Sequence, residues 1–305
     1  MYYQAGMKKG FGSRFFDLFN ILFMLVFSFL VLYPFWNQLV YSFNDGNDAA
    51  RGGLYFWPRV ISFDAYGFLF SNQRLAKGAV VSIMRVVVGT TTCLFCTGLL
   101  AYIVTIRSFS GRRFMRILFM ITMYISGGLI PYYLLISRIG LINTFTVYWL
   151  PNLLNAYYML LMASFIQELP ESLMEAARID GCTELKTYRK IVVPMSMPVY
   201  AAVAVYLSVE HWNSWFDCMI YNPSGEWDTL QVFLRRMLLE REAAAQATDQ
   251  IVRNTRFNKV TPLTIRAATT MVVTIPIAVV YPFFQKYFVG GLTLGSVKER
   301  IDNGN

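Results

Sequence analysis

The sequence predicts an all-α protein that crosses a membrane as a polytopic bundle with six transmembrane helices. The first observation is composition: 56% of the 305 residues are hydrophobic and only 15% are charged, whereas soluble domains contain about 25% charged residues. The second is that apolar residues gather in stretches of the roughly 20 residues that a helix needs to cross a bilayer. These stretches are residues 19–41, 79–105, 115–136, 145–166, 198–220 and 264–285.

The first stretch follows the basic residues Lys8, Lys9 and Arg14, which is also how a secretory signal peptide begins. No small-residue cleavage site follows it. Residues 33–36 read Tyr-Pro-Phe-Trp, and aromatic residues of this kind are typical of a helix end at the membrane interface. We therefore expect a retained transmembrane helix.

Residues that break helices interrupt the fourth and sixth stretches. The fourth contains Pro151, Asn152 and Asn155, and the sixth contains Pro276 and Pro282. Proline within a span is tolerated where neighbouring helices or water satisfy the carbonyls that it leaves free. We expect these helices to lie inside the bundle or to be kinked.

The basic residues of the short turns predict the orientation. Four arginines lie between Arg107 and Arg116 after the second stretch, whereas the turn after the third holds only Arg138. Short arginine-rich turns stay in the cytoplasm, so the turn after the second stretch is expected on the cytoplasmic side. Alternation then puts both termini and the loop of residues 168–198 in the cytoplasm, and the two long segments 44–78 and 221–262 outside.

Motifs for catalysis or metal binding are missing from the sequence. It has no G-x-x-x-x-G-K-[ST] phosphate loop, so we do not expect this chain to bind and hydrolyse ATP by itself. Its single histidine is His211, and Cys93 and Cys96 lie inside an apolar helix where packing is the better interpretation. No catalytic residue, metal or cofactor is predicted, and residues 1–305 are expected to form one membrane domain.

Polar side chains within the spans are functional candidates, because they are costly in a membrane. In the fifth stretch Tyr206, Glu210 and Asn213 share one helix face, beside Trp212. Rings next to amides and carboxylates suit sugars, whose C–H faces pack on rings while their hydroxyls need hydrogen-bond partners. The alternative is asparagines that only join helices and aromatic residues of an interfacial belt. The candidate pathway residues are Asn152, Asn155, Tyr158, Tyr206, Glu210, Trp212 and Asn213.

The loop of residues 168–198 is predicted to form two short amphipathic helices joined by a glycine corner. Pro170 suits the first position of a helix, and Gly181 suits its end because glycine enters the left-handed conformation without steric cost. The second helix is expected from Thr183 to about Pro194. Its apolar face is predicted to hold Leu185, Tyr188 and Val192, and its basic face Lys186, Arg189 and Lys190.

Such a helix pair has three interpretations. DNA binding is disfavoured because spans tether both ends. The loop would otherwise lie in the headgroup layer as an amphipathic element, or form a docking surface for a cytoplasmic partner. If the loop is a docking surface, Glu175 is available to pair with an arginine of the partner, while Ala176 and Ala177 permit the partner to approach closely. The residues alone leave these two open.

The loop also resembles a known motif. Residues 175–177 (Glu-Ala-Ala), Asp180-Gly181 and residues 191–194 resemble the "Glu-Ala-Ala" loop in permease subunits of binding-protein-dependent ABC importers. Two further sets of segments carry the resemblance. Residues 127–131, 139–144 and 285–293 resemble the smaller permease of the maltose-type carbohydrate importers, and residues 229–235 and 265–268 resemble its branch for complex or acidic oligosaccharides.

The resemblance implies a maltose-permease-like fold in a bacterial cytoplasmic membrane and a set of partners. These are a second related permease, a cytoplasmic ATPase dimer that holds ATP and Mg, an external substrate-binding protein, an oligosaccharide and membrane lipid, with no nucleic acid. The loop would be the coupling helix that docks on the ATPase. Cys182, where family members commonly have alanine, departs from the pattern. The implied coupling residues are Glu175, Ala176, Ala177, Asp180, Gly181 and Pro194.

The resulting hypothesis is ATP-driven alternating access in a six-span permease. A stand-alone sugar transporter driven by an ion gradient is the alternative, and would need a buried carboxylate relay for which Glu210 and Asp217 are the candidates. A non-transporting scaffold is a third hypothesis. Arg85 and Arg266 are expected to snorkel or to pair with a carboxylate. A mild positive excess in the external loops would suit an anionic oligosaccharide.

Overall fold

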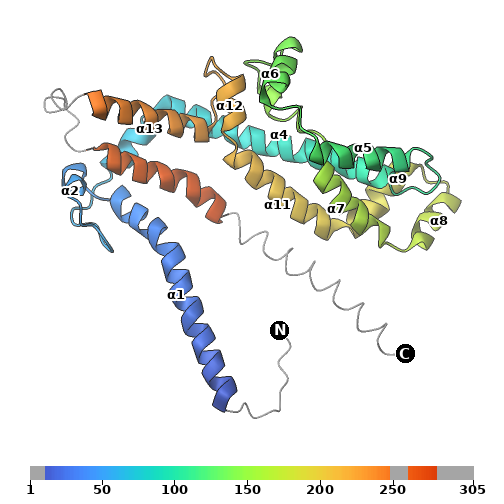
Figure 1. The fold of residues 1–305 in the computed structure, drawn as a ribbon, viewed down its shortest axis with the longest axis horizontal. Coiled ribbons are helices and arrows are strands. Elements are labelled where there is room, and N and C mark those ends of the chain that lie inside the picture. The colour runs from blue at the N-terminus through green and yellow to red at the C-terminus, as the bar shows by residue number, and fades with distance from the viewer. Residues whose placement is uncertain (1–10, 248–259, 280–305) are drawn as a thin grey trace. The chain divides into compact units, whose positions relative to one another are not determined.

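The computed structural model describes residues 11–247 and 260–279 (Figure 1). Within these residues the regular elements are helices, and one isolated β-bridge pairs Asn44 with Ile61. The predicted all-α fold class is confirmed. The described residues fall into two compact units, of which the first contains residues 11–71, 240–247 and 260–274 and the second residues 72–239 and 275–279.

The first unit contains the long helix α1 (Phe11–Ser42). Its segment Phe15–Ser42 is apolar enough to cross a membrane, and none of its most apolar window is buried by protein. A helix of this composition is stable when lipid surrounds it. Polar contacts hold its end against the following loop: Trp36 Nε1 donates to the Phe56 carbonyl at 2.9 Å, and Asn37 Nδ2 donates to the Leu54 carbonyl at 2.9 Å.

Two short helices follow α1, namely α2 (Gly46–Ala50) and α3 (Asp64–Phe70). The loop between them is fixed at Asp48, which accepts a hydrogen bond from Asn44 Nδ2 at 2.9 Å and pairs with Arg59 Nε at 3.0 Å. The Asn44 hydrogen bond, followed by the Arg59 contact, holds the pKa of Asp48 below its usual value.

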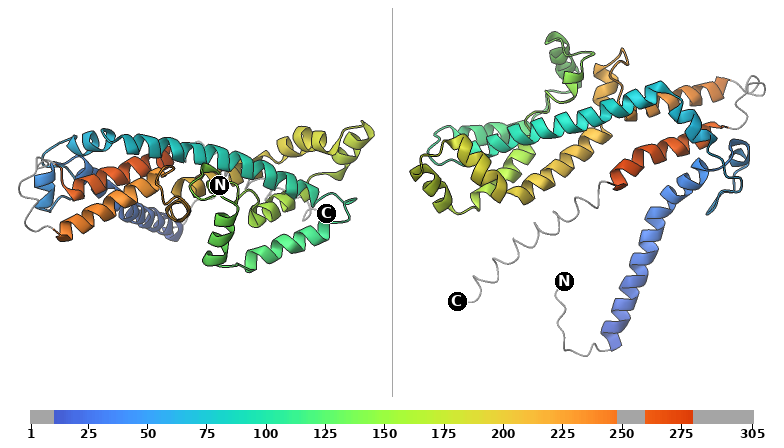
Figure 2. Two further views of the ribbon diagram at one scale, coloured as in Figure 1. Left: turned by 90° about the horizontal axis from the view of Figure 1, so that it is seen from above. Right: turned by 180° about the vertical axis from the view of Figure 1, so that it is seen from behind.

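The second unit is built around α4 (Gln73–Ile103), α7 (Ala156–Gln167) and α11 (Met197–Asn213), which pack on one another. α4 and α11 run side by side in the views of Figures 1 and 2. Two glycines of α4 permit this approach. A Cβ at Gly89 would lie 2.5 Å from Nε2 of His211, and one at Gly98 would lie 2.5 Å from the Tyr200 hydroxyl. The core between the helices includes Cys93, Leu100, Ala101, Met159, Met162, Ala163, Val203 and Leu207.

The other elements of this unit surround the three central helices. They are α5 (Arg112–Tyr124), α6 (Leu129–Arg138), η1 (Phe145–Tyr148), α8 (Glu171–Ile179), α9 (Glu184–Thr187), the π-helical turn η2 (Tyr188–Val192), α10 (Val193–Met195), α12 (Phe216–Tyr221) and the start of α13 (Leu230–Ala247).

Three predicted spans are present as long apolar helices. Phe15–Ser42, Gln73–Ile103 and Pro262–Val279 correspond to the first, second and sixth stretches. Pro276 lies within the last of these helices, and the predicted continuation from residue 280 to 285, with Pro282, falls outside the described residues.

The other three stretches differ from the prediction. The third is broken into α5 and α6, which are bent by 118°, because Gly128 adopts a φ of +81° that ends a right-handed helix. The fourth begins with the short 3₁₀ helix η1, and its α-helix starts only at Ala156, after Asn155 caps it, so the 12 residues of α7 rise about 18 Å. The fifth helix ends at Asn213, and α12 follows as a separate helix.

Candidate functional site

The loop of residues 168–198 folds as two helices joined at a glycine, as predicted. α8 begins one residue later than expected, because Pro170 is its N-cap and Glu171 its first residue. At its end Gly181 has a φ of +70°. The Gly181 amide donates to the Arg178 carbonyl at 3.0 Å and the Cys182 amide to the Ala177 carbonyl at 2.9 Å. This pair of bonds is a Schellman motif, which satisfies the last carbonyls of the helix.

One face of α8 is exposed. Ser172, Glu175, Ala176 and Ile179 are exposed and spaced so that they share this face, which we call the outer face. Ile179 is 86% exposed. The side chain of Glu175 has no hydrogen bond or ion pair with any residue that the structure describes. An apolar side chain and an unpaired carboxylate on one exposed face are typical of a protein contact surface.

The two alanines of the motif have different environments. Ala176 is exposed on the outer face, whereas Ala177 is 4% exposed and faces the interior. The expectation that both alanines allow a partner to approach is therefore wrong for Ala177. Its small side chain allows α8 to pack closely on its own protein instead. Asp180 is exposed at the end of the helix.

The second helix of the loop agrees with the predicted faces except at one position. Tyr188 and Val192 are buried, and Lys186, Arg189 and Lys190 are exposed. Leu185 is 51% exposed, although it was expected on the apolar face. Thr187 is buried in its place, because two residues correspond to about 200° of helical rotation and so to opposite sides.

The helix also runs past Pro194. It continues through the π-helical turn to Met195 and bends by 84° before α11. A wider turn of this kind accommodates proline, which has no N–H to donate and clashes with the preceding turn of a regular helix. The predicted end near Pro194 is thus early by one residue.

Glu184 ties the loop to the central helices. Its carboxylate accepts a hydrogen bond from the Tyr102 hydroxyl in the last turn of α4, and pairs with Arg178 Nε of α8 at 3.3 Å. The Tyr188 ring lies 5.7 Å from that of Tyr102, and its hydroxyl accepts a hydrogen bond of 3.0 Å from Tyr200 of α11. Displacement of the loop would therefore pull on α4 and α11.

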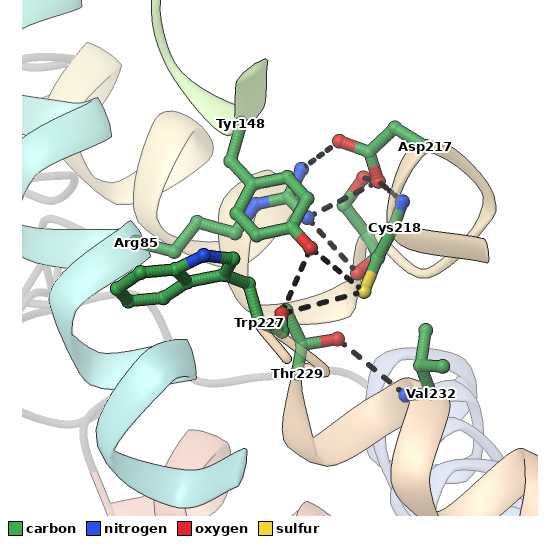
Figure 3. A network of polar contacts seen from close by, with 8 residues as sticks. Arg85, Tyr148, Asp217, Cys218, Trp227, Thr229 and Val232 are labelled. Carbon is green, nitrogen blue, oxygen red and sulfur yellow. Dashed lines mark hydrogen bonds and ion pairs between the residues drawn. The ribbon is translucent and has the colours of Figure 1, made fainter. Parts of the chain in front are cut away.

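A second polar network is centred on Arg85, which lies near the middle of α4 (Figure 3). The guanidinium of Arg85, which is 1% exposed, forms a two-pronged ion pair with Asp217 and lies 4.8 Å from the centre of the Tyr148 ring. The Tyr148 hydroxyl donates to the Trp227 carbonyl at 2.8 Å. Of the two expectations for Arg85, pairing with a carboxylate is confirmed. Asp217 also accepts from Ser214 Oγ at 3.1 Å.

This network anchors the segment that follows α12. The Leu230 amide donates to Ser82 Oγ of α4 at 2.8 Å, and a Cβ at Gly78 would lie 3.3 Å from the Leu230 nitrogen. Burial raises the pKa of Asp228, and its contact with Arg236 at 3.3 Å opposes that rise. Arg235 stacks over Trp215 at 3.7 Å from the ring centre.

The candidate pathway residues are only partly brought together. Tyr158 of α7 stacks on Tyr206 of α11 with ring centroids 6.4 Å apart. Asn155 instead caps the start of α7, because its side-chain Oδ1 accepts a hydrogen bond from the Tyr158 backbone amide at 3.1 Å. The backbone amide of Asn155 donates to Thr97 Oγ1 at 3.2 Å. Trp212 is half-buried, and three further candidates are exposed, namely Asn152, Glu210 and Asn213.

Sequence reasoning missed the residues that act across helices. The pairs Tyr102–Glu184 and Trp215–Arg235 join positions distant in sequence, and no motif marks them. The one available signal was that tyrosine and tryptophan carry a polar group that seeks a partner when buried.

Comparisons with known proteins agree with the loop and the fold. Residues 3–215 match the family described as "Binding-protein-dependent transport system inner membrane component". The polygalacturonan/rhamnogalacturonan transport system permease protein YtcP of Bacillus subtilis (strain 168) is 33% identical over 287 residues, covering 94% of this chain and 99% of the relative. Protein LplC of the same organism is 36% identical over 288 residues, covering 94% and 96%.

A solved structure is also similar. It is a chain of a bacterial ABC transporter involved in the import of the acidic polysaccharide alginate, with a TM-score of 0.83 and 26% identity, covering 93% of this chain and 100% of that one.

The chain therefore belongs to the family of inner membrane components of binding-protein-dependent transport systems. It is the permease subunit of a sugar ABC importer, not itself a catalyst, and the resemblance inferred from residues 175–194 is confirmed. The alternative of a stand-alone secondary transporter is not supported.

Proposed function

We propose that this permease works by ATP-driven alternating access, together with a second related permease and a cytoplasmic ATPase dimer. ATP and Mg would be bound by the ATPase subunits and by no residue of this chain. The observation that carries the proposal is the outer face of α8: Glu175 is exposed and unpaired there, while the same loop is tied through Glu184 to α4. Closure of the ATPase dimer would move the loop and, through it, the central helices.

A contact of α8 also supports the orientation that we propose. Arg107, in the arginine-rich turn, pairs with Glu171 of α8 at 2.9 Å. This turn is therefore a neighbour of the loop of residues 168–198, which we call the coupling loop. Arginine-rich short turns stay in the cytoplasm. Both termini would then be cytoplasmic, and the segment from residue 221 would face the external substrate-binding protein.

The transported substrate is proposed to be an acidic oligosaccharide. Support comes from the relatives, whose names refer to polygalacturonan and to the acidic polysaccharide alginate. The Tyr158–Tyr206 stack offers ring faces for a sugar, and the exposed Arg235, held over Trp215, offers a cation for a carboxylate. Asn152, Glu210, Trp212 and Asn213 are further proposed contacts along the pathway.

Uptake by reconstituted vesicles tests the proposal. Vesicles containing both permeases and the ATPase should take up an oligogalacturonide only when ATP is inside and the loaded binding protein outside. A neutral oligosaccharide of equal length serves as the control for the charge of the substrate. Uptake by this chain alone, driven by an ion gradient, would contradict the mechanism, and equal uptake of the neutral sugar would contradict the substrate class.

A further inference from the structure

A cleft rich in arginine opens beside the coupling loop. Its volume is about 540 Å³, and it lies between the end of α4, the start of α5, the end of α7 and α8. Five arginines and a single carboxylate line it. These residues are Arg107, Arg112, Arg113, Arg116, Arg178 and Glu171.

The acceptors within the cleft do not satisfy its donors. Glu171 pairs with Arg107, and Arg178 pairs with Glu184. Arg116 donates from Nη2 to the Val104 carbonyl at 2.9 Å, but its buried Nε has no partner. The side chains of Arg112 and Arg113 are exposed and form no hydrogen bond or ion pair with any described residue. The cleft therefore presents an excess of guanidinium donors, which favour phosphate oxygens.

Apolar side chains also form part of the cleft wall. Ile106, Ile166, Leu169 and Met174 line it beside the arginines. From the cleft an exposed apolar stripe continues along one face of α5, because its members are spaced by three, one and three residues. These are Phe114, Ile117, Leu118 and Ile121, each at least 45% exposed.

A ligand that matches both features has an anionic phosphate head and an apolar tail. We infer that the cleft binds the headgroup of one anionic phospholipid, whose acyl chain follows the stripe on α5. Basic pockets between membrane helices on the cytoplasmic side recognise anionic headgroups in this way. The assignment to the cytoplasmic leaflet rests on the proposed orientation. Since Glu171, Met174 and Arg178 of α8 form one wall, the bound lipid would brace the coupling helix.

Native mass spectrometry of the purified importer complex tests this inference. The complex is exposed to phosphatidylglycerol, to phosphatidylcholine, or to inorganic phosphate without lipid. We expect selective retention of phosphatidylglycerol. Replacing Arg112 and Arg113 together by Gln should weaken it by about 30-fold, since each arginine near an anionic surface contributes about fivefold. The matched control replaces Arg189 and Lys190 by Gln, which removes two exposed charges from the loop of residues 168–198, outside the cleft, and should leave retention unchanged.

Three outcomes would overturn the inference. They are equal retention of phosphatidylglycerol by the Arg112→Gln/Arg113→Gln variant and the parent complex, equal retention of phosphatidylcholine, and binding of inorganic phosphate at these arginines with no lipid retained. The measurement detects lipid and not transport. Its failure would therefore leave the proposed coupling mechanism standing, and failure of ATP-driven uptake would leave the lipid result standing.

Discussion

The hydroxyl of Tyr102, in the last turn of α4, donates a hydrogen bond to the carboxylate of Glu184 at the start of α9. The two residues lie 82 positions apart in the sequence. This contact joins the longest helix of the second unit to the loop that carries Glu175. It supplies a physical route by which movement of the loop reaches the membrane helices.

Removing this hydrogen bond should weaken coupling. In Tyr102→Phe the ring still packs on Tyr188, but Glu184 loses one of its two donors and keeps Arg178, at a cost of about 1 kcal/mol. We expect the ATPase activity of the assembled complex to depend less on the loaded binding protein, while its basal activity persists. Tyr124→Phe is the control, because Tyr124 is 86% exposed. Full stimulation in Tyr102→Phe would show that coupling does not use this contact.

The glycine corner gives a prediction about stability. Gly181→Ala places a side chain at a φ of +70°, which should cost about 1 kcal/mol and loosen the Schellman motif. Gly127→Ala is a matched control, since a Cβ there meets nothing within 4 Å and Gly127 has no positive φ. Thermal unfolding of the two purified variants measures the difference. Equal midpoints would mean that the corner is not conformationally demanding.

The buried ion pair of Arg85 and Asp217 should stabilise the protein far more than the exposed pair of Arg59 and Asp48. Arg85→Gln leaves Asp217 without its cation and should destabilise the protein by about 3 kcal/mol or more. Arg59→Gln disrupts the pair with Asp48, where the arginine is 46% exposed, and should cost about 1 kcal/mol or less. Chemical unfolding measures the free energy of unfolding of both variants. A smaller loss of this free energy in Arg85→Gln than in Arg59→Gln would contradict the prediction.

The cysteines allow a direct test of the orientation. Cys182 is partly exposed beside the glycine corner, whereas Cys93 and Cys218 are buried. A membrane-impermeant thiol reagent should label Cys182 in inside-out vesicles and leave it unlabelled in intact cells. Cys182→Ser identifies the labelled site. Labelling of Cys182 from outside intact cells would reverse the proposed orientation.

Local rules predicted the parts of the structure that depend on single residues. Gly181 ends α8, Thr183 caps α9, and Tyr188 and Val192 are buried, because backbone freedom, capping and periodicity are properties of short segments. Hydropathy found the long helices for the same reason. Hydropathy wrongly predicted α5 and α6 as one helix, because the positive φ at Gly128 interrupts the helix while the stretch stays apolar.

What the sequence did not predict depends on contacts between distant segments. Burial of Thr187 in place of Leu185 is set by the side of α9 that packs on the protein. Asn155 was expected in the substrate pathway, but it caps α7 with a hydrogen bond from the Tyr158 amide. An asparagine at this position of the sequence is equally compatible with either role. The arginines of the 540 Å³ cleft were recognised as an orientation signal, and only the fold places Arg178 of α8 among them.

Retention of the ATPase by a Glu175 variant tests the central claim most directly. Glu175→Lys should fold normally, because the side chain is exposed, yet it presents the wrong charge to the partner. Like charges across an interface cost several kcal/mol, so ATPase binding should weaken by roughly 100-fold or more. Glu226→Lys makes the same charge change in the segment that we propose to be external, and it should retain the ATPase. Undiminished co-purification of the ATPase with Glu175→Lys, together with normal ATP-driven uptake, would contradict docking on the outer face of α8.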